Sequence, residues 1–109
     1  MLRAVFYRQD GSYSGFSVSG HAGFGTEGND IVCAAVSSAV MLVCNAVTDF
    51  LNADASVQVE ENRITLRLCR NDDPSQRLIE AFYAHMEAIA EEYGRIKLEA
   101  HNIGGQNND

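Results

Sequence analysis

The sequence predicts an α+β fold of the order β-β-α-β-β-α-β, with two helices packed on a mixed, largely antiparallel five-stranded sheet. Five short segments alternate apolar and polar residues with a period of two, which is typical of half-buried strands. Two longer segments have helical patterns, one almost entirely apolar and one amphipathic. Short paired strands combined with two separate helices indicate helices packed on a sheet.

The N-terminal segment predicts a β-hairpin. Residues 2–9 and 13–20 both alternate, and in the second run Phe16 and Val18 share one face. The intervening residues 10–12 read Asp-Gly-Ser, a sequence that favours a tight turn. We therefore expect two antiparallel strands joined by a short connection.

A helix is predicted over about residues 30–51, after a loop with four glycines in residues 20–28. Asn29 or Asp30 provides its N-cap. Residues 31–48 contain no charged side chain, which meets the length threshold for a membrane span. The stretch is rich in Ala, Ser, Cys and Asn and lacks basic flanks, so we expect a helix buried in the protein or at a subunit contact, and no membrane partner.

The C-terminal half predicts strands at 55–60 and 63–68, and then a helix from 73 to 93. Asp73 is its expected cap, with proline at the first helical position and glutamine three residues after the cap. Gly94 is the expected stop. The predicted apolar stripe of this helix consists of Leu78, Phe82, Met86, Ile89 and Tyr93.

The chain ends in a predicted fifth strand, residues 95–101, and a polar tail. The tail, residues 102–109, is rich in asparagine and glycine, a composition typical of disorder. At 109 residues the chain has the size of one domain, so we expect a single domain over residues 1–101.

The net charge of −7 and the pI near 4.8 argue against direct binding to nucleic acid, because acidic surfaces repel phosphate. The same charge favours a basic partner.

Three cysteines without a CxxC spacing predict neither a disulfide framework nor a metal site. A reducing cytoplasm fits this cysteine usage best, and Arg8 interrupts the N-terminal apolar run too soon for a signal peptide. We expect no cofactor.

The most informative residues are His21 and Cys33, which flank the glycine-rich loop. Cys33 is predicted in the first turn of a helix, where free amides and the helix dipole favour thiolate over thiol. An imidazole within reach can hold or move the thiol proton, and the helix amides can stabilise an oxyanion. Asp30 either orients His21 or only caps the helix. The pair predicts a cysteine nucleophile.

Other interpretations remain open at this point. A cysteine in an apolar helix is often a packing residue, and Cys44 fits that description. A glycine-rich loop before a helix can bind phosphate, but the GxxxxGK spacing is absent and Glu27 would repel it. Cys33 with Cys69, or with a second subunit, could form a redox sensor. A non-catalytic module that docks on the ribosome through its acidic surface is the main alternative function.

Two segments together resemble the signature of the ribosomal-processing cysteine proteases, the Prp family. They are Gly20-His21-Ala22-Gly23 and Asp30-Ile31-Val32-Cys33-Ala34-Ala35-Val36-Ser37. The resemblance implies a cytoplasmic endopeptidase that removes a short N-terminal extension from the twenty-seventh protein of the large ribosomal subunit. This basic ribosomal protein would be its partner.

The resemblance also implies the roles of individual residues. Cys33 is the expected nucleophile and His21 the general base, with Asp30 and Ser37 as supporting residues. The loop that contains Gly23, Phe24, Gly25 and Gly28 is expected to close over the substrate, and the enzyme is expected to be a homodimer.

Overall fold

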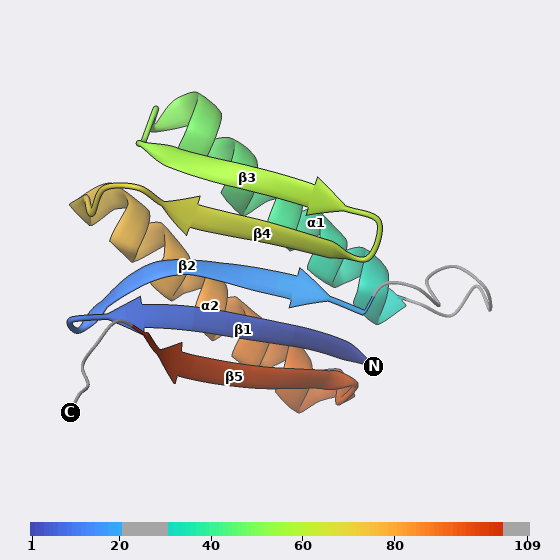
Figure 1. Cartoon of the computed structure of the whole chain (residues 1–109). Helices are drawn as coiled ribbons and strands as arrows, with labels where there is room; N and C mark the ends of the chain where they lie inside the picture. Colours follow the sequence, from blue (N-terminus) through green and yellow to red (C-terminus); the bar gives the residue numbers. More distant parts are fainter. Residues whose placement is uncertain (21–30, 104–109) are drawn as a thin grey trace.

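Five strands and two long helices form two layers, with both helices on one face of the sheet (Figure 1). The computed structural model describes residues 1–20 and 31–103. Its elements, in chain order, are β1 (Leu2–Gln9), β2 (Ser12–Ser19), α1 (Ile31–Asn45), the π-helical turn η2 (Ala46–Phe50), β3 (Ala55–Glu60), β4 (Arg63–Leu68), α2 (Asp73–Tyr93) and β5 (Ile96–Asn102).

The strands lie in the order β3-β4-β2-β1-β5. Antiparallel pairing joins β1 to β2, β2 to β4, and β4 to β3, whereas β5 pairs in parallel with β1. The connection through α2 returns the chain to the far edge, which makes β5 parallel. The predicted fold class, a mixed and largely antiparallel sheet carrying two helices, is confirmed.

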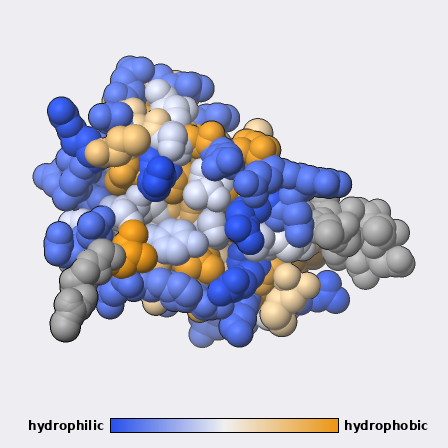
Figure 2. Space-filling view, in the orientation of Figure 1, coloured by the Kyte–Doolittle hydropathy of each residue, from blue (hydrophilic) through white to orange (hydrophobic). Residues whose placement is uncertain are grey.

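Period-two alternation divides the sheet into two faces. Leu2, Ala4 and Phe6 of β1 are buried beneath the helices, and Phe16 and Val18 of β2 are buried with them. The other face, toward the viewer in Figures 1 and 2, carries mostly hydrophilic side chains. The expected hairpin is confirmed, and its turn includes Asp10 and Gly11 at positive φ.

Three phenylalanine rings form the centre of the core. The ring centroids of Phe6 lie 5.6 Å from Phe16 and 5.5 Å from Phe82, and those of Phe16 and Phe82 are 4.8 Å apart. Helix α1 adds Val36 and Val40, both fully buried. Aromatic rings at these separations contribute dispersion and edge contacts beyond simple burial, so β1, β2 and α2 pack as one unit.

The first helix differs from the prediction at its C-terminal end. The α-helix ends at Asn45, and residues 46–50 continue as a π-helical turn. The Thr48 hydroxyl donates to the Cys44 carbonyl oxygen at 3.0 Å, and the Leu51 amide donates to the Ala46 carbonyl oxygen at 2.8 Å. A hydroxyl that bonds four residues back disturbs the α-helical ladder, and the chain widens to an i→i+5 pattern.

The N-cap of the second helix lies one residue earlier than predicted. Asp72, in an extended conformation, accepts a hydrogen bond from the Ser75 amide at 2.8 Å, so Asp72 and not Asp73 is the N-cap. Gln76 does not complete a capping box. Its side chain exchanges two hydrogen bonds with the backbone of Tyr13, at 2.8 and 2.7 Å, and thereby ties α2 to β2. Gly94 ends the helix as expected.

The buried stripe of α2 also differs from the prediction. Ile79 is fully buried, whereas Tyr93 is 49% exposed and Leu78 only half-buried. At this turn the buried position is therefore one residue further along the chain than predicted. Leu78 lines a groove on the side of α2 that faces α1. Strand β5 spans Ile96–Asn102, one residue later at each end than the predicted strand, and the Ile103 amide donates to the Arg8 carbonyl oxygen. Residues 104–109 lie outside the described residues.

Candidate active site

Cys33 is the third residue of α1 and lies in its first turn. The side chain is half-buried and packs against the edge of the core. Its neighbour Val32 points into the core at 5% exposure. The first turn of a helix presents amides without intrahelical partners and the positive end of the dipole. A thiol in this position is accessible and lies where negative charge is stabilised.

Ser37 lies one helical turn after Cys33. It is also half-buried, and the spacing of four residues puts the two side chains on neighbouring positions of one helix face. Val36 and Val40, on the adjacent face, are fully buried and hold α1 on the sheet. The helix therefore presents Cys33 and Ser37 beside its buried edge.

The other predicted site residues fall in segment 21–30, which is not among the residues the structure describes. These residues are His21, Gly23, Phe24, Gly25, Gly28 and Asp30. The structure therefore does not test the distance between His21 and Cys33. It does describe Gly20 and Ile31, the residues on either side of this segment. The end of β2 and the start of α1 lie at the same end of the molecule (Figure 1).

Gly20 fixes where the chain leaves β2. Its φ is +99°, and a Cβ at this position would lie 2.5 Å from the Met1 carbonyl oxygen. The Gly20 amide donates to the Asn62 carbonyl oxygen at 3.3 Å. Only glycine fits both the backbone conformation and the close approach of the N-terminus. The residue that precedes His21 is thus held against two other segments of the sheet.

The remaining cysteines have different surroundings. Cys44 is buried, and burial raises the pKa of its thiol to about 11. The interpretation of Cys44 as a packing residue agrees with this environment. Cys69 is exposed and directly follows β4. Because β4 ends and α1 begins at opposite ends of the molecule (Figure 1), an intramolecular disulfide between Cys69 and Cys33 is sterically excluded in this fold.

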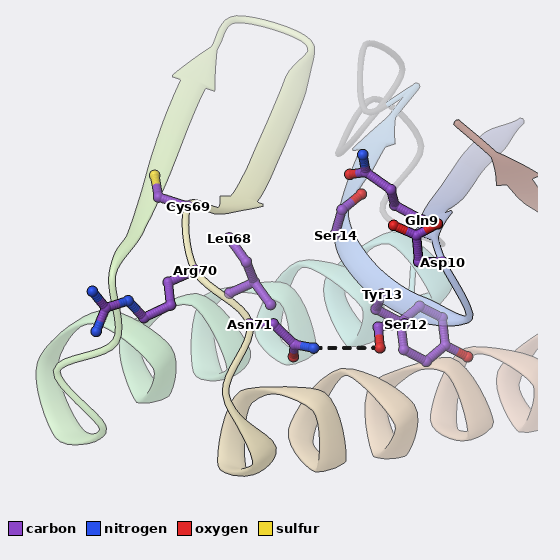
Figure 3. Close-up of a pocket in the computed structure, with 9 residues that line it drawn as sticks. All are labelled: Gln9, Asp10, Ser12, Tyr13, Ser14, Leu68, Cys69, Arg70 and Asn71. Carbon is purple, nitrogen blue, oxygen red and sulfur yellow. Dashed lines mark hydrogen bonds between the residues drawn. The ribbon is translucent and has the colours of Figure 1, made fainter. Parts of the chain in front are cut away.

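A polar depression of about 270 Å³ lies beside Cys69, where the turn between β1 and β2 meets the chain after β4 (Figure 3). The Asn71 side chain donates to the Ser12 hydroxyl at 3.4 Å across it. The Cys69 sulfur points away from this hydrogen bond (Figure 3). Among the residues that the structure describes, no histidine lines this depression, so none of them provides a base for the Cys69 thiol there.

No group of three His, Cys, Asp or Glu side chains that could hold a metal ion occurs within residues 1–20 and 31–103. The segment Ile31–Phe50 is long and apolar enough to cross a membrane by length and composition alone. Its inner face contributes Val36, Val40 and Val47 to the core, and core helices of globular proteins pass the same test. Packing in the core thus accounts for the apolar residues of the inner face of this segment.

The outer face of α1 and η2 carries exposed apolar side chains. Met41 is 55% exposed, Leu42 69% and Phe50 81%. Two neighbouring apolar grooves, of about 470 and 410 Å³, lie between this face and α2, and both are lined by Leu78 and Ala81. Apolar surface gathered in this way on a small protein indicates a contact with another macromolecule.

Three comparisons place this chain among known proteins. Residues 1–97 match the family model described as cysteine protease Prp. The fold is similar to SMU.848 from Streptococcus mutans, with 32% sequence identity and a TM-score of 0.84, covering 94% of this chain and 96% of that one. A search of curated proteins gives no significant match.

The fold is also similar to an essential ribosomal processing protease Prp from S. aureus. The structure of that protein with a covalently linked product peptide has 25% identity and a TM-score of 0.82, covering 92% of this chain and 99% of that one. A second structure of it, with a substrate peptide, has 24% identity and the same TM-score and coverage.

Proposed function

The chain belongs to the Prp family of cysteine proteases, and we propose that it removes a short N-terminal extension from the twenty-seventh protein of the large ribosomal subunit. The observation that carries the proposal is a half-buried cysteine in the first turn of α1, within a chain that matches the family over residues 1–97. The similar S. aureus protein is a ribosomal processing protease with a product peptide covalently linked to it. We take residues 1–101 as the protease domain.

In the proposed mechanism, His21 accepts the proton of the Cys33 thiol. The sulfur attacks the scissile carbonyl carbon, and the oxyanion that forms is stabilised by amides of the first turn of α1. His21 then donates the proton to the leaving amine, and the peptide C–N bond breaks. Water, deprotonated by His21, hydrolyses the thioester and releases the carboxylate product and the thiol.

The supporting residues have separate proposed roles. Asp30 orients His21 or caps α1, and either role would stabilise the arrangement of the pair. Ser37, one turn after Cys33, provides a hydroxyl on the same helix face. Gly23, Phe24, Gly25 and Gly28 form the proposed substrate loop.

The proposed substrate has the charge that this surface attracts. Ribosomal proteins are basic, and the chain has a net charge of −7. Long-range attraction of this kind raises the rate of encounter and weakens with salt. We place the reaction in the cytoplasm, where ribosomes assemble and where cysteine thiols remain reduced.

The exposed apolar face of α1 and η2 supports a homodimer. Leu42 and Phe50 line the grooves between α1 and α2, and a second copy of the chain would cover them. Cys33 lies in the first turn of α1 and Leu42 near its end, so the same helix carries the proposed active site and the proposed interface.

The direct test incubates the enzyme with the extended ribosomal protein and follows its mass. We expect a new species that lacks the N-terminal extension, and we expect Cys33→Ala to lower the rate at least ~10³-fold, because removing a nucleophile removes the covalent path. Cys44→Ala is the matched control in the same helix, and its rate should stay within about threefold of wild type.

Two outcomes would decide against this proposal. Equal cleavage by Cys33→Ala and wild type would exclude Cys33 as the nucleophile. Tight binding of the precursor without any cleavage by the wild type would favour the alternative, a non-catalytic module that docks on the ribosome. The coupling of His21 to Cys33 is tested separately, by the pH dependence of Cys33 alkylation in wild type and His21→Ala. An unchanged profile would contradict it.

A further inference from the structure

The open face of the sheet, which the helices do not cover, carries side chains in three rows across the strands. The register aligns Glu60, Arg63, Ser19, Arg3 and Lys97 in one row. The middle row contains Gln58, Thr65, Ser17, Val5 and Glu99. The third row contains Ser56, Arg67, Gly15, Tyr7 and His101. Four cations and two carboxylates share this face of an otherwise acidic protein.

A depression of about 460 Å³ crosses these rows between β3 and β1. Arg63 and Arg67 border it on β4, and hydroxyl and amide side chains line the space between them. Figure 2 shows this face, where side chains of intermediate hydropathy at the centre are surrounded by hydrophilic ones. Four residues of strand at about 3.3 Å each separate the two arginines by roughly 13 Å.

The cations on this face are not equivalent. Arg3 is bound to Glu99 through two hydrogen bonds, at 2.9 and 3.1 Å. Arg63 and Arg67 are exposed, and neither has an ion pair within the described part of the chain, although Glu60 lies opposite Arg63 in the register. Two guanidinium groups are thus available to an anionic ligand beside the depression.

The floor of the depression includes an aromatic ring next to a glycine. Tyr7 lines the space and is half-buried, and its ring contacts that of His101 edge-on at 6.3 Å. Its cross-strand neighbour Gly15 has φ of +155°, and a Cβ there would collide with the Leu66 carbonyl oxygen. Position 15 therefore admits only glycine, and no side chain stands between Tyr7 and Arg67 on this face.

We propose that this sheet face binds single-stranded RNA, with Arg63 and Arg67 on successive phosphate groups and the Tyr7 ring against a base. Guanidinium groups bind phosphate in a planar, two-pronged geometry, and aromatic side chains on sheets stack with unpaired bases. The hydroxyls of Ser17, Thr65 and Ser56 provide donors for ribose and phosphate oxygens.

The observations favour RNA over an acidic peptide. A polycarboxylate would use the two arginines but has no group that pairs with the Tyr7 ring. A second copy of the chain would have to place a different, acidic surface here, which is a head-to-tail contact and not the two-fold contact of a dimer. The net charge of −7 predicts no nucleic-acid binding, and the proposal departs from that prediction, because the register concentrates unpaired cations on one face.

The test measures fluorescence anisotropy of a labelled oligouridylate of roughly twelve nucleotides, with the full chain, from about 50 to about 200 mM salt. We expect saturable binding that weakens with salt. The double variant Arg63→Gln/Arg67→Gln should lose at least ~10-fold in affinity and flatten the log–log salt slope by about one to two. Tyr7→Leu should lose about fivefold or more.

The matched control is Arg77→Gln, which removes an exposed arginine from α2 on the other side of the molecule. It should bind within about twofold of wild type, and circular dichroism should show all variants folded. Absence of binding at about 50 mM salt would overturn the proposal. Equal losses in Arg77→Gln and the double variant would overturn it too.

A competing oligoglutamate of equal charge separates RNA from a general polyanion. Displacement of the RNA at equal concentration would show a peptide-binding surface and contradict the proposal. Cys33→Ala should bind RNA as wild type does, because this face does not include Cys33, so failure of the proposed protease function would leave RNA binding measurable.

Discussion

Helices α1 and α2 lie on the same face of the sheet, but their outer surfaces differ. Every residue of α1 is uncharged, and Met41 and Leu42 are exposed to solvent. Helix α2 exposes charged side chains such as Arg77 and Glu80, and buries its apolar stripe against the sheet. Both helices contribute apolar side chains to the core, but α1 exposes apolar side chains to water and α2 exposes charged ones.

This difference distinguishes α2, which supports the fold, from α1, to which we assign a function. Helix α2 satisfies its own ends, with Asp72 at its start and Gly94 at its stop, and its solvent face needs no partner. Helix α1 begins at the proposed site and leaves an apolar face uncovered. An exposed apolar face of this kind indicates a use for α1 beyond packing.

Matched methionines on the two helices test this contrast most strongly. Met86 of α2 is fully buried and Met41 of α1 is 55% exposed. We expect Met86→Ala to lower the free energy of unfolding by ~2–5 kcal/mol, because it leaves a cavity in the core. Met41→Ala should change it by less than about 0.5 kcal/mol. Urea denaturation of both variants measures the difference, and equal losses would contradict the assignment of the two faces.

A charge on the outer face of α1 tests its proposed role in self-association. Leu42→Glu should weaken dimerisation at least ~10-fold, because it buries a carboxylate in an apolar contact. Ala84→Glu places the same charge on the exposed side of α2 and should leave the dimer unchanged. Sedimentation velocity over a dilution series measures both. A wild type that is monomeric at all concentrations would contradict the proposed dimer.

The caps of α2 give a smaller effect. Asp72→Ala removes the acceptor of the Ser75 amide and should destabilise the protein by about 1 kcal/mol. Asp73→Ala removes no cap and should cost a few tenths of that, through the helix dipole alone. Thermal unfolding compares the two. A larger loss for Asp73→Ala would show that the cap predicted from the sequence is the correct one.

The smallest effect appears only at alkaline pH. The folded protein raises the Cys44 pKa from 9.0 to about 11, so the folded state holds this proton more tightly than the unfolded state. The stability from this term is complete below pH 9 and is lost as the pH rises through 11. At about pH 10 wild type should lose roughly 1 kcal/mol more than Cys44→Ala, relative to neutral pH.

Denaturation at several pH values measures this difference. Parallel pH profiles of wild type and Cys44→Ala would contradict it. Cys44 should also resist alkylation at neutral pH while the protein is folded, whereas the exposed Cys69 should react. Mass mapping of the modified cysteines is the corresponding check.

Much of the fold was predictable because its signals are local. Alternation in residues 2–9 and 63–68 reflects a strand with one buried face, and both strands form where predicted. Gly94 ends α2 because a positive φ is required there. The position of Cys33 in the first turn of a helix also followed from the sequence, since the loop and the apolar run define where α1 begins.

The errors occurred where a hydrogen bond that the sequence pattern does not show decides the local structure, between distant segments or within one helix. Gln76 was expected to cap its own helix. Instead, the oxygen and the nitrogen of its side-chain amide both form hydrogen bonds with the backbone of Tyr13, 63 positions away. At the end of α1, where the π-helical turn begins, the Thr48 hydroxyl donates to the Cys44 carbonyl oxygen. Val59 continues the alternation of apolar and polar residues in β3, yet it is 71% exposed, because β3 lies at the edge of the sheet.

The sequence by itself determined the order of the elements, the family resemblance and the place of the cysteine at a helix start, because each depends on residues close together in the chain. The tertiary structure alone decided which strands are neighbours, and hence that Arg63, Arg67 and Tyr7 share one uncovered face. Strand order is set by hydrogen bonds between segments far apart in sequence, and the average charge of a chain carries no information about how those bonds distribute its cations.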